Sequence, residues 1–279
     1  MVRTVRFAVA ALMGLVAVRC AGVPTAPHEI PPVTFPQPPD PQPPQPPPPA
    51  PVPHLRVTRI LSFGDSITEG EATPALWGLK APQSAGVSKS YPFKLQTLLT
   101  DRYTEQMVEV WNGGLGGDRA TTARPRLVGL LDQFKPEVMI LMMGVNDINS
   151  GISSKAIIDA LADLVREATA RGAQVLVSTL TPQDPRGFRG GSAAAIPPFN
   201  AELAARAPGM GATLVDIFPV ISLDMMAPDG LHLAQSGNQA LAETYFARLK
   251  EKYEEQPAPS AASRAPALAG RPLARARRR

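Results

Sequence analysis

The sequence predicts an α/β fold of three layers, in which helices cover both faces of a flavodoxin-like parallel sheet of five strands. Short, continuous apolar runs alternate with longer helical patterns, as is typical of strands that are buried on both faces. Polar residues that can take part in catalysis or binding directly follow these runs. The carboxyl ends of parallel strands meet at one edge of the sheet, where ligands bind. We therefore expect the strand order 2-1-3-4-5 for strands at residues 57–63, 107–112, 137–143, 173–179 and 212–217.

The expected helices lie between these strands. Ser90 is a suitable N-cap for the first of them, and Pro92 falls in its first turn, where a missing N–H costs no hydrogen bond. Two long connections without periodicity, residues 70–89 and 183–198, leave the active edge and are predicted to contact substrate. The other expected helices are residues 119–134, 153–171, 198–207 and 236–254.

The amino-terminal residues predict export. Arg3 and Arg6 precede an apolar run that is too short to span a bilayer permanently, which indicates a signal peptide over residues 1–22. We expect a periplasmic, cell-surface or secreted protein. Cys20 is the only cysteine and offers a site for lipid anchoring, but Arg19 stands where a small residue is expected, so free secretion is favoured.

Both ends of the chain differ in composition from the middle. Residues 23–54 form a proline-rich linker that favours extended structure, and residues 256–279 form a basic tail that we expect to be disordered. The linker would tether the domain, residues 55–255, to a membrane or cell wall, or would serve as a ligand for an aromatic groove.

Charge and metal-ligand residues exclude several functions. The net charge of +4 comes from the termini and leaves a slightly acidic domain, so we expect no nucleic-acid partner. His28 and His54 lie in the linker, which leaves His232 as the single histidine of the domain. We therefore expect no metal site and no cofactor. The sequence indicates no oligomeric state.

Three residues have the chemistry of a serine hydrolase. Ser66 follows the first strand, and His232 would accept its proton while Asp229, three residues earlier, orients the imidazole. Each has a plainer interpretation: Ser66 as a turn or helix-cap residue, and Asp229 with His232 as a turn and a half-buried histidine. If His232 is the base, activity rises with pH as the imidazole loses its proton.

Donors for a developing negative charge follow the next two strands. The glycines of NGGLGGD let backbone N–H groups approach a ligand, with Gly117 before a helix, and Asn146 follows the most apolar strand. Asp118 as a helix cap, and Asn146 with Asp147 as a turn, are the alternatives.

Together these segments resemble the four blocks of the SGNH or GDSL esterase/lipase superfamily: GDSIT, NGGLGGD, GVND and DGLH. The resemblance covers residues 56–250. It implies a three-layer α/β/α fold and an esterase in which Ser66 attacks, and an oxyanion hole of the Ser66 and Gly117 N–H groups with the Asn146 side chain. Gly116 replaces a small polar residue common in the family, and Gly117 rather than Gly114 is chosen as donor by this resemblance.

Three functions stay open. The first is an esterase for small acyl esters, acetylated carbohydrates or lysolipids; the second is an acyltransferase that modifies a cell-surface glycan with the same residues; the third is a non-catalytic binding module. The presence of Ser66, Asp229 and His232 together argues against a non-catalytic binding module. Candidate substrate contacts in the two long loops are Trp77, Phe188, Arg186 and Arg189, either as an apolar wall with an anion site or as ordinary exposed loop residues.

Overall fold

Five parallel strands form the central sheet of this computed structural model, which describes residues 52–70 and 90–255. The strand order is β3-β2-β4-β5-β6, which is the predicted order 2-1-3-4-5 counted along the chain. The predicted order is therefore confirmed. The strands are β2 (Arg59–Gly64), β3 (Glu109–Gly114), β4 (Val138–Met142), β5 (Gln174–Ser178) and β6 (Thr213–Val215).

The central strands owe their position to their apolar sequences. All five residues of β4 are buried, as expected for a strand that is covered on both faces. In the register of the sheet, Ile60 of β2 lies opposite Val110 on one side and Val138 on the other. This register brings the carboxyl ends of β2, β3 and β4 to the same edge, where the polar residues of the site begin.

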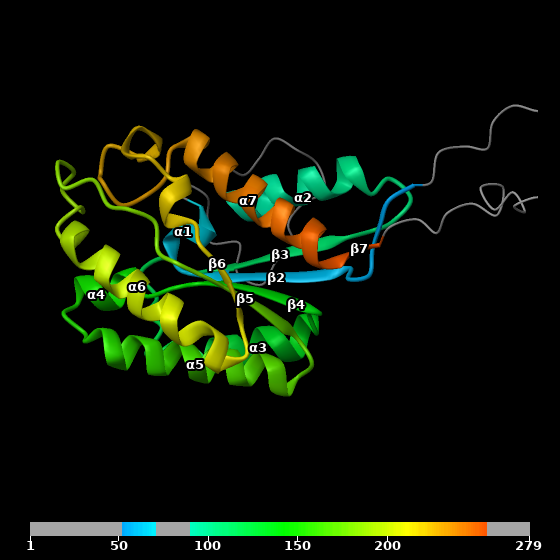
Figure 1. Cartoon of the computed structure of the whole chain (residues 1–279), viewed down its shortest axis with the longest axis horizontal. Helices are drawn as coiled ribbons and strands as arrows, with labels where there is room; N and C mark the ends of the chain where they lie inside the picture. Colours follow the sequence, from blue (N-terminus) through cyan, green and yellow to red (C-terminus); the bar gives the residue numbers. More distant parts are fainter. Residues whose placement is uncertain (1–51, 71–89, 256–279) are drawn as a thin grey trace, which may run out of the picture. The chain divides into compact units, whose positions relative to one another are not determined.

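Helices cover both faces of the sheet, which confirms the three-layer fold (Figure 1). One layer consists of α2 (Tyr91–Arg102) and α7 (Gln235–Tyr253), and the other of α3 (Arg124–Phe134), α5 (Ser154–Ala170) and α6 (Ile196–Arg206). The helix α5 begins after an N-cap serine, because the Ser153 side chain accepts a hydrogen bond from the Ala156 N–H. None of the described helices has both the length and the apolar character needed to cross a membrane.

The structure departs from the predicted start of one helix and from the predicted cap of another. The helix expected from residue 119 begins at Arg124, because the N–H groups of Ala120 and Thr121 donate to the carboxylate of Asp147 and hold this segment in a turn. Ser90 occupies the N-cap position of α2, as predicted, but its side chain makes no capping hydrogen bond. Ser90 was predicted as a cap and Asp118 was the alternative cap for the later helix, where a tertiary contact with Asp147 instead replaces the first helical turn.

Several short elements were not predicted, because two to five residues carry no measurable periodicity. These are α1 (Ser66–Glu69) and α4 (Val145–Asn149), which follow β2 and β4, and the antiparallel pair β1 (His54–Leu55) and β7 (Glu254–Glu255). His54, assigned to the linker from the sequence, therefore lies in a strand. The 3-10 helices are Ala193–Ala195, Ala207–Met210, Phe218–Val220 and Leu223–Met225.

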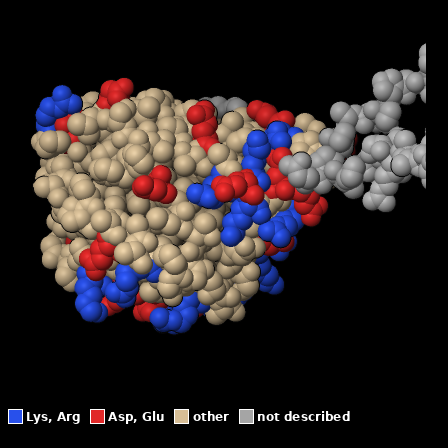
Figure 2. Space-filling model, in the orientation of Figure 1, with Lys and Arg blue, Asp and Glu red and all other residues tan. Residues whose placement is uncertain are grey.

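Some predictions lie outside the described residues: the export signal, Cys20, most of the linker, Trp77 and the basic tail. The face of the domain seen in Figure 2 carries Lys and Arg side chains beside Asp and Glu side chains, with no stripe of one sign on that face. The expectation that nucleic acid is not a partner stays a prediction.

Candidate active site

The candidate site lies at the carboxyl edge of the sheet, where Ser66 starts α1 directly after β2. Asp65 is the N-cap of α1, and its side chain accepts the Ile67 N–H at 3.0 Å. The helix cap is therefore Asp65 and not Ser66, whose hydroxyl faces His232. As the first N–H of the helix, the Ser66 N–H has no partner within α1.

A row of hydrogen bonds connects Ser66 with two residues that are 166 and 163 positions away. The Ser66 Oγ lies 2.8 Å from His232 Nε2, and His232 Nδ1 lies 2.5 Å from Asp229 Oδ2. Asp229 and His232 are buried, whereas Ser66 is half-buried. A proton on Nδ1 that is donated to Asp229 leaves Nε2 as the acceptor for the serine proton.

The carboxylate of Asp229 is held in its ionised form. Burial alone would raise the pKa of Asp229, but the N–H groups of Leu231 and His232, both 3.0 Å from Oδ1, and the His232 side chain outweigh burial and lower this pKa. Gly230 has a φ of +81°, a left-handed conformation that suits glycine and lets the chain fold back at this turn. The turn therefore supplies a charged acceptor that faces His232.

The loop of residues 184–190 contacts this turn through backbone hydrogen bonds. The Arg189 N–H donates to the Asp229 carbonyl at 2.8 Å, and the Asp184 N–H donates to the Gly230 carbonyl at 2.9 Å. The two backbones approach so closely that a Cβ on Gly187 would lie 2.4 Å from the Asp229 carbonyl carbon. Residues 184–190 thus fix the backbone position of Asp229.

The predicted oxyanion donors meet beside Ser66. Gly117 has a φ of +76° and borders the pocket, and a Cβ added to it would meet no atom within 4 Å. Asn146, the second residue of α4, donates one Nδ2 hydrogen to the Asp118 carbonyl at 2.9 Å. A side-chain amide has two N–H bonds, so Asn146 Nδ2 has a second hydrogen that it can donate. Together with the Ser66 N–H, these groups can accept a developing negative charge.

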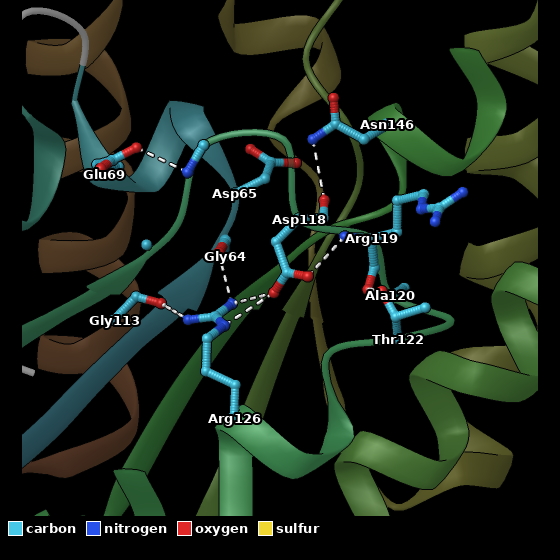
Figure 3. A network of polar contacts seen from close by, with 12 residues as sticks. Gly64, Asp65, Glu69, Gly113, Asp118, Arg119, Ala120, Thr122, Arg126 and Asn146 are labelled. Atoms are coloured by element: carbon cyan, nitrogen blue, oxygen red, sulfur yellow. Dashed lines mark hydrogen bonds and ion pairs between the residues drawn. The ribbon is translucent and has the colours of Figure 1, made fainter. Parts of the chain in front are cut away.

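The loop of residues 115–121 is held by charged side chains that the sequence analysis did not identify as functional. The buried carboxylate of Asp147 accepts from the Thr121 hydroxyl at 2.7 Å as well as from two backbone N–H groups. Asp118 forms an ion pair with Arg126 at 2.7 Å rather than capping α3, whose N-cap is Ala123. Figure 3 shows Arg126 between the ends of two strands and the carboxylate of Asp118.

One signal for Arg126 was present in the sequence. Arg124 and Arg126 are two positions apart in the first turn of a helix, and such residues point to opposite sides. At most one of them can therefore face the sheet. The Arg124 side chain is 64% exposed and pairs with Glu167, whereas the Arg126 side chain is only 8% exposed.

Two further carboxyl groups lie close to Ser66. Burial raises the pKa of Asp65 to about 7, despite the hydrogen bond from Ile67 and the charge of His232, which both lower it. Glu69 borders the pocket and accepts the Gly116 N–H at 2.7 Å. Glu69 thereby fixes the residue before Gly117, at the position where the sequence departs from the family pattern.

The site opens into a pocket of about 750 Å³. Phe188, 86% exposed, and Arg189 lie at its rim, and the Arg189 Nε is 4.0 Å from Asp229 Oδ2. Arg186 instead forms a bidentate ion pair with Asp184, at 2.9 and 2.7 Å. Within residues 52–70 and 90–255, no group of three or more His, Cys, Asp or Glu side chains is arranged to hold a metal ion.

Comparison with known proteins adds sequence similarity to this geometry. Residues 62–240 match the model of the GDSL-like Lipase/Acylhydrolase family. An arylesterase of Vibrio mimicus is 31% identical over 121 residues, which are 43% of this chain and 52% of that protein. The match thus spans about half the length of this curated relative.

Solved structures share the fold. An acetylxylan esterase, Axe2, from Geobacillus stearothermophilus superposes with a TM-score of 0.59 at 17% identity, over 69% of this chain and 94% of that one. A carbohydrate esterase of family 3 from Talaromyces cellulolyticus gives 0.51 at 17% identity, over 70% and 97%. The structure of TesA gives 0.54 at 25% identity, over 69% and 98%.

Proposed function

The chain belongs to the GDSL-like lipase/acylhydrolase family, and we propose that it is a serine esterase in which Ser66 is the nucleophile, His232 the base and Asp229 the orienting acid. The observation that carries the proposal is the continuous hydrogen-bonded row from Asp229 through His232 to Ser66. A site retained only for binding has no need of this arrangement, so a non-catalytic module is disfavoured.

The reaction proceeds in two steps. Ser66 Oγ attacks the ester carbonyl carbon while its proton moves to His232 Nε2, and this proton then passes to the leaving alcohol as the acyl-enzyme forms. Water enters, gives a proton to His232 and attacks the acyl carbon. The carboxylic acid leaves, and the proton returns to Ser66. Asp229 stays ionised throughout, consistent with the hydrogen bonds that lower its pKa.

Each tetrahedral intermediate carries a negative oxygen, for which Ser66, Gly117 and Asn146 supply three N–H donors. Fixed donors that need no reorganisation are worth about 100- to 1,000-fold each in kcat. The contacts of Asn146 with Asp118 and of Gly116 with Glu69 support this assignment, because they hold the loop in one position.

The preferred substrates would be short acyl esters of hydroxyl-rich alcohols such as carbohydrates. Most of the described residues that line the pocket are glycines or carry polar side chains, and Phe188, Ala227 and Pro228 are the apolar ones among them; this lining offers little apolar surface to a long hydrocarbon chain and favours a small acyl group. The exposed Phe188 ring and the Arg189 guanidinium at the rim offer a stacking face and hydrogen-bond donors for the alcohol. Phe188→Ala is expected to raise KM for an acetylated oligosaccharide more than KM for a nitrophenyl acetate; equal changes would remove this role.

The test is hydrolysis of nitrophenyl acetate, butyrate and octanoate by the full chain and by Ser66→Ala and His232→Ala variants. We expect each variant to lose at least about 1,000-fold in kcat, with acetate the best acyl group. Ser222→Ala is the matched control, because Ser222 is exposed and lies outside the site. A folded Ser66→Ala variant with parental turnover would contradict the proposal. Transfer of acetyl to an added oligosaccharide, faster than release of acetate, would identify an acyltransferase instead.

A further inference from the structure

Arg126 is a largely buried arginine directly beneath the candidate oxyanion loop. Its side chain is 8% exposed, and its guanidinium lies 4.0 Å from the centre of the Phe63 ring. Nη1 donates to the carbonyl of Gly113, the last residue but one of β3, at 2.5 Å. Nη2 donates to the carbonyl of Gly64, the last residue of β2, at 2.9 Å. One guanidinium thus joins the ends of two neighbouring strands.

The same guanidinium also holds the loop that follows β3. Arg126 Nε donates to Asp118 Oδ2 at 2.8 Å, and Nη2 lies 2.7 Å from the same oxygen (Figure 3). The Asp118 side chain is 11% exposed, so this ion pair is shielded from solvent. If either side chain moved away, the other would keep a buried charge without a partner. The ion pair therefore strongly favours the one geometry in which both side chains are in contact.

Each proposed oxyanion donor is connected to the contacts of Arg126 through the chain or through a hydrogen bond. Ser66 lies two residues after Gly64, Gly117 directly precedes Asp118, and Asn146 Nδ2 donates to the Asp118 carbonyl. The Leu115 N–H also donates to the Gly64 carbonyl, which closes the loop against β2. A displacement of the Arg126 guanidinium would therefore move all three donors relative to one another.

We propose that Arg126 is the positioning residue that aligns the three oxyanion donors, with Asp118 as its intermediary. This inference rests on the esterase function proposed above and extends it. Arg126 does not border the pocket and touches no reacting atom, so it acts through the loop. The role requires arginine, because a planar guanidinium serves two carbonyls and a carboxylate at fixed angles, whereas a lysine ammonium is a point charge on a flexible stem.

The experiment compares Arg126→Lys and Asp118→Asn with the parent in the full chain, using nitrophenyl acetate. Misaligned oxyanion donors weaken binding of the transition state but not of the ester, so we expect kcat to fall about 100-fold and KM to change less than about 3-fold. The pH of half-maximal activity stays that of the parent, because Ser66, His232 and Asp229 keep their contacts. A purely structural role would not produce this separation of kcat from KM.

A double-mutant cycle with Asn146→Ala tests the route of the effect. If Arg126 acts by aligning the donors, the combined loss in kcat is smaller than the product of the two single losses. Arg102→Lys is the matched control, since Arg102 makes a bidentate pair with Glu254 and is remote from the site. Thermal unfolding of every variant shows whether activity loss follows loss of folded protein.

Three results would overturn the inference: a kcat for Arg126→Lys no lower than for Arg102→Lys, independent effects in the cycle, or a loss explained by the unfolded fraction. If Arg126→Lys does not fold, Asp118→Asn decides, because it keeps the side-chain size and an acceptor oxygen. If Ser66→Ala loses activity while Arg126→Lys and Asp118→Asn keep the activity of the parent, only this inference is refuted. Parental activity in Ser66→Ala refutes the esterase function as well.

Discussion

Asp65 combines a structural and an electrostatic effect at one buried position. Its side chain caps α1, the helix that begins at Ser66, yet only 1% of the residue is exposed. Burial raises the pKa of Asp65 from 3.8 to about 7, because a charge at this position is poorly solvated. The buried cap therefore lowers the stability of the folded state once the pH is high enough for Asp65 to lose its proton.

Replacement of Asp65 by Asn tests how much stability the buried, ionised carboxylate removes. Between about pH 4 and pH 7 the folded state binds a proton that the unfolded state has lost, so stability falls as the pH rises through this window. Asn keeps an acceptor oxygen for the Ile67 N–H and carries no charge. We expect Asp65→Asn to be more stable than the parent by about 1–3 kcal/mol at pH 8, with the difference shrinking toward pH 4. Urea unfolding at both pH values measures it, and a difference independent of pH would contradict the assignment.

At the scale of elements, the loop of residues 184–190 and the turn of residues 228–230 form one unit. The loop donates two backbone hydrogen bonds to carbonyl groups of the turn, and glycine is required where they touch, since a Cβ on Gly187 would meet the Asp229 backbone at 2.4 Å. The position of Asp229 relative to His232 thus depends on a segment that is about 40 residues away in the sequence.

Gly187→Ala should therefore act on catalysis through Asp229. The added methyl group displaces the turn, and a displacement of about 1 Å at a reacting group costs on the order of 100-fold in rate. We expect kcat to fall by about 10- to 100-fold. Gly191→Ala is the matched control, because a Cβ there meets nothing within 4 Å. Steady-state kinetics of both variants, with unfolding curves, decide; equal kcat values would show that the loop yields without moving Asp229.

The same elements show how far sequence reasoning reaches. The order of the sheet and the candidate residues Ser66, Asn146, Asp229 and His232 followed from apolar runs and from the residues after them, which are local signals, whereas the choice of Gly117 followed from the resemblance to the family. Arg126, Asp147 and Glu69 were not identified, because their roles depend on contacts with segments 13 to 62 residues away. The start of α3 was misplaced for the same reason: Asp147 binds backbone groups that would otherwise begin the helix.

At the scale of the domain, the two ends of the described chain meet opposite the site. His54 pairs with Glu255 in the β1–β7 ladder, and the Tyr253 hydroxyl donates to Gln174, the first residue of β5. Ser66 follows the other end of a six-residue strand, about 20 Å away along β2. The described chain therefore begins at the edge of the sheet opposite Ser66.

The ladder is secured by one carboxylate. Glu254 accepts two hydrogen bonds from Arg102, at 2.6 and 2.7 Å, and one from the Tyr103 hydroxyl at 2.6 Å. The bonds from Arg102 are the main reason that the pKa of Glu254 falls from 4.5 to about 2. A lowered carboxyl pKa stabilises the fold above pH 4.5, and this contribution is lost as the pH falls toward 2.

Glu254→Gln removes this contribution at the end remote from Ser66. Allowing for solvent screening, we expect the free energy of unfolding at pH 7 to fall by about 1–2 kcal/mol and the difference from the parent to vanish near pH 2. Because the ladder and the site lie at opposite edges of the sheet, kcat at pH 7 should stay unchanged. Glu251→Gln, which breaks an exposed pair with Arg248, should cost less than about 0.5 kcal/mol. Urea unfolding across pH, with kinetics on the same samples, measures both; a fall in kcat with Glu254→Gln would mean that the closure of the chain ends is coupled to the site.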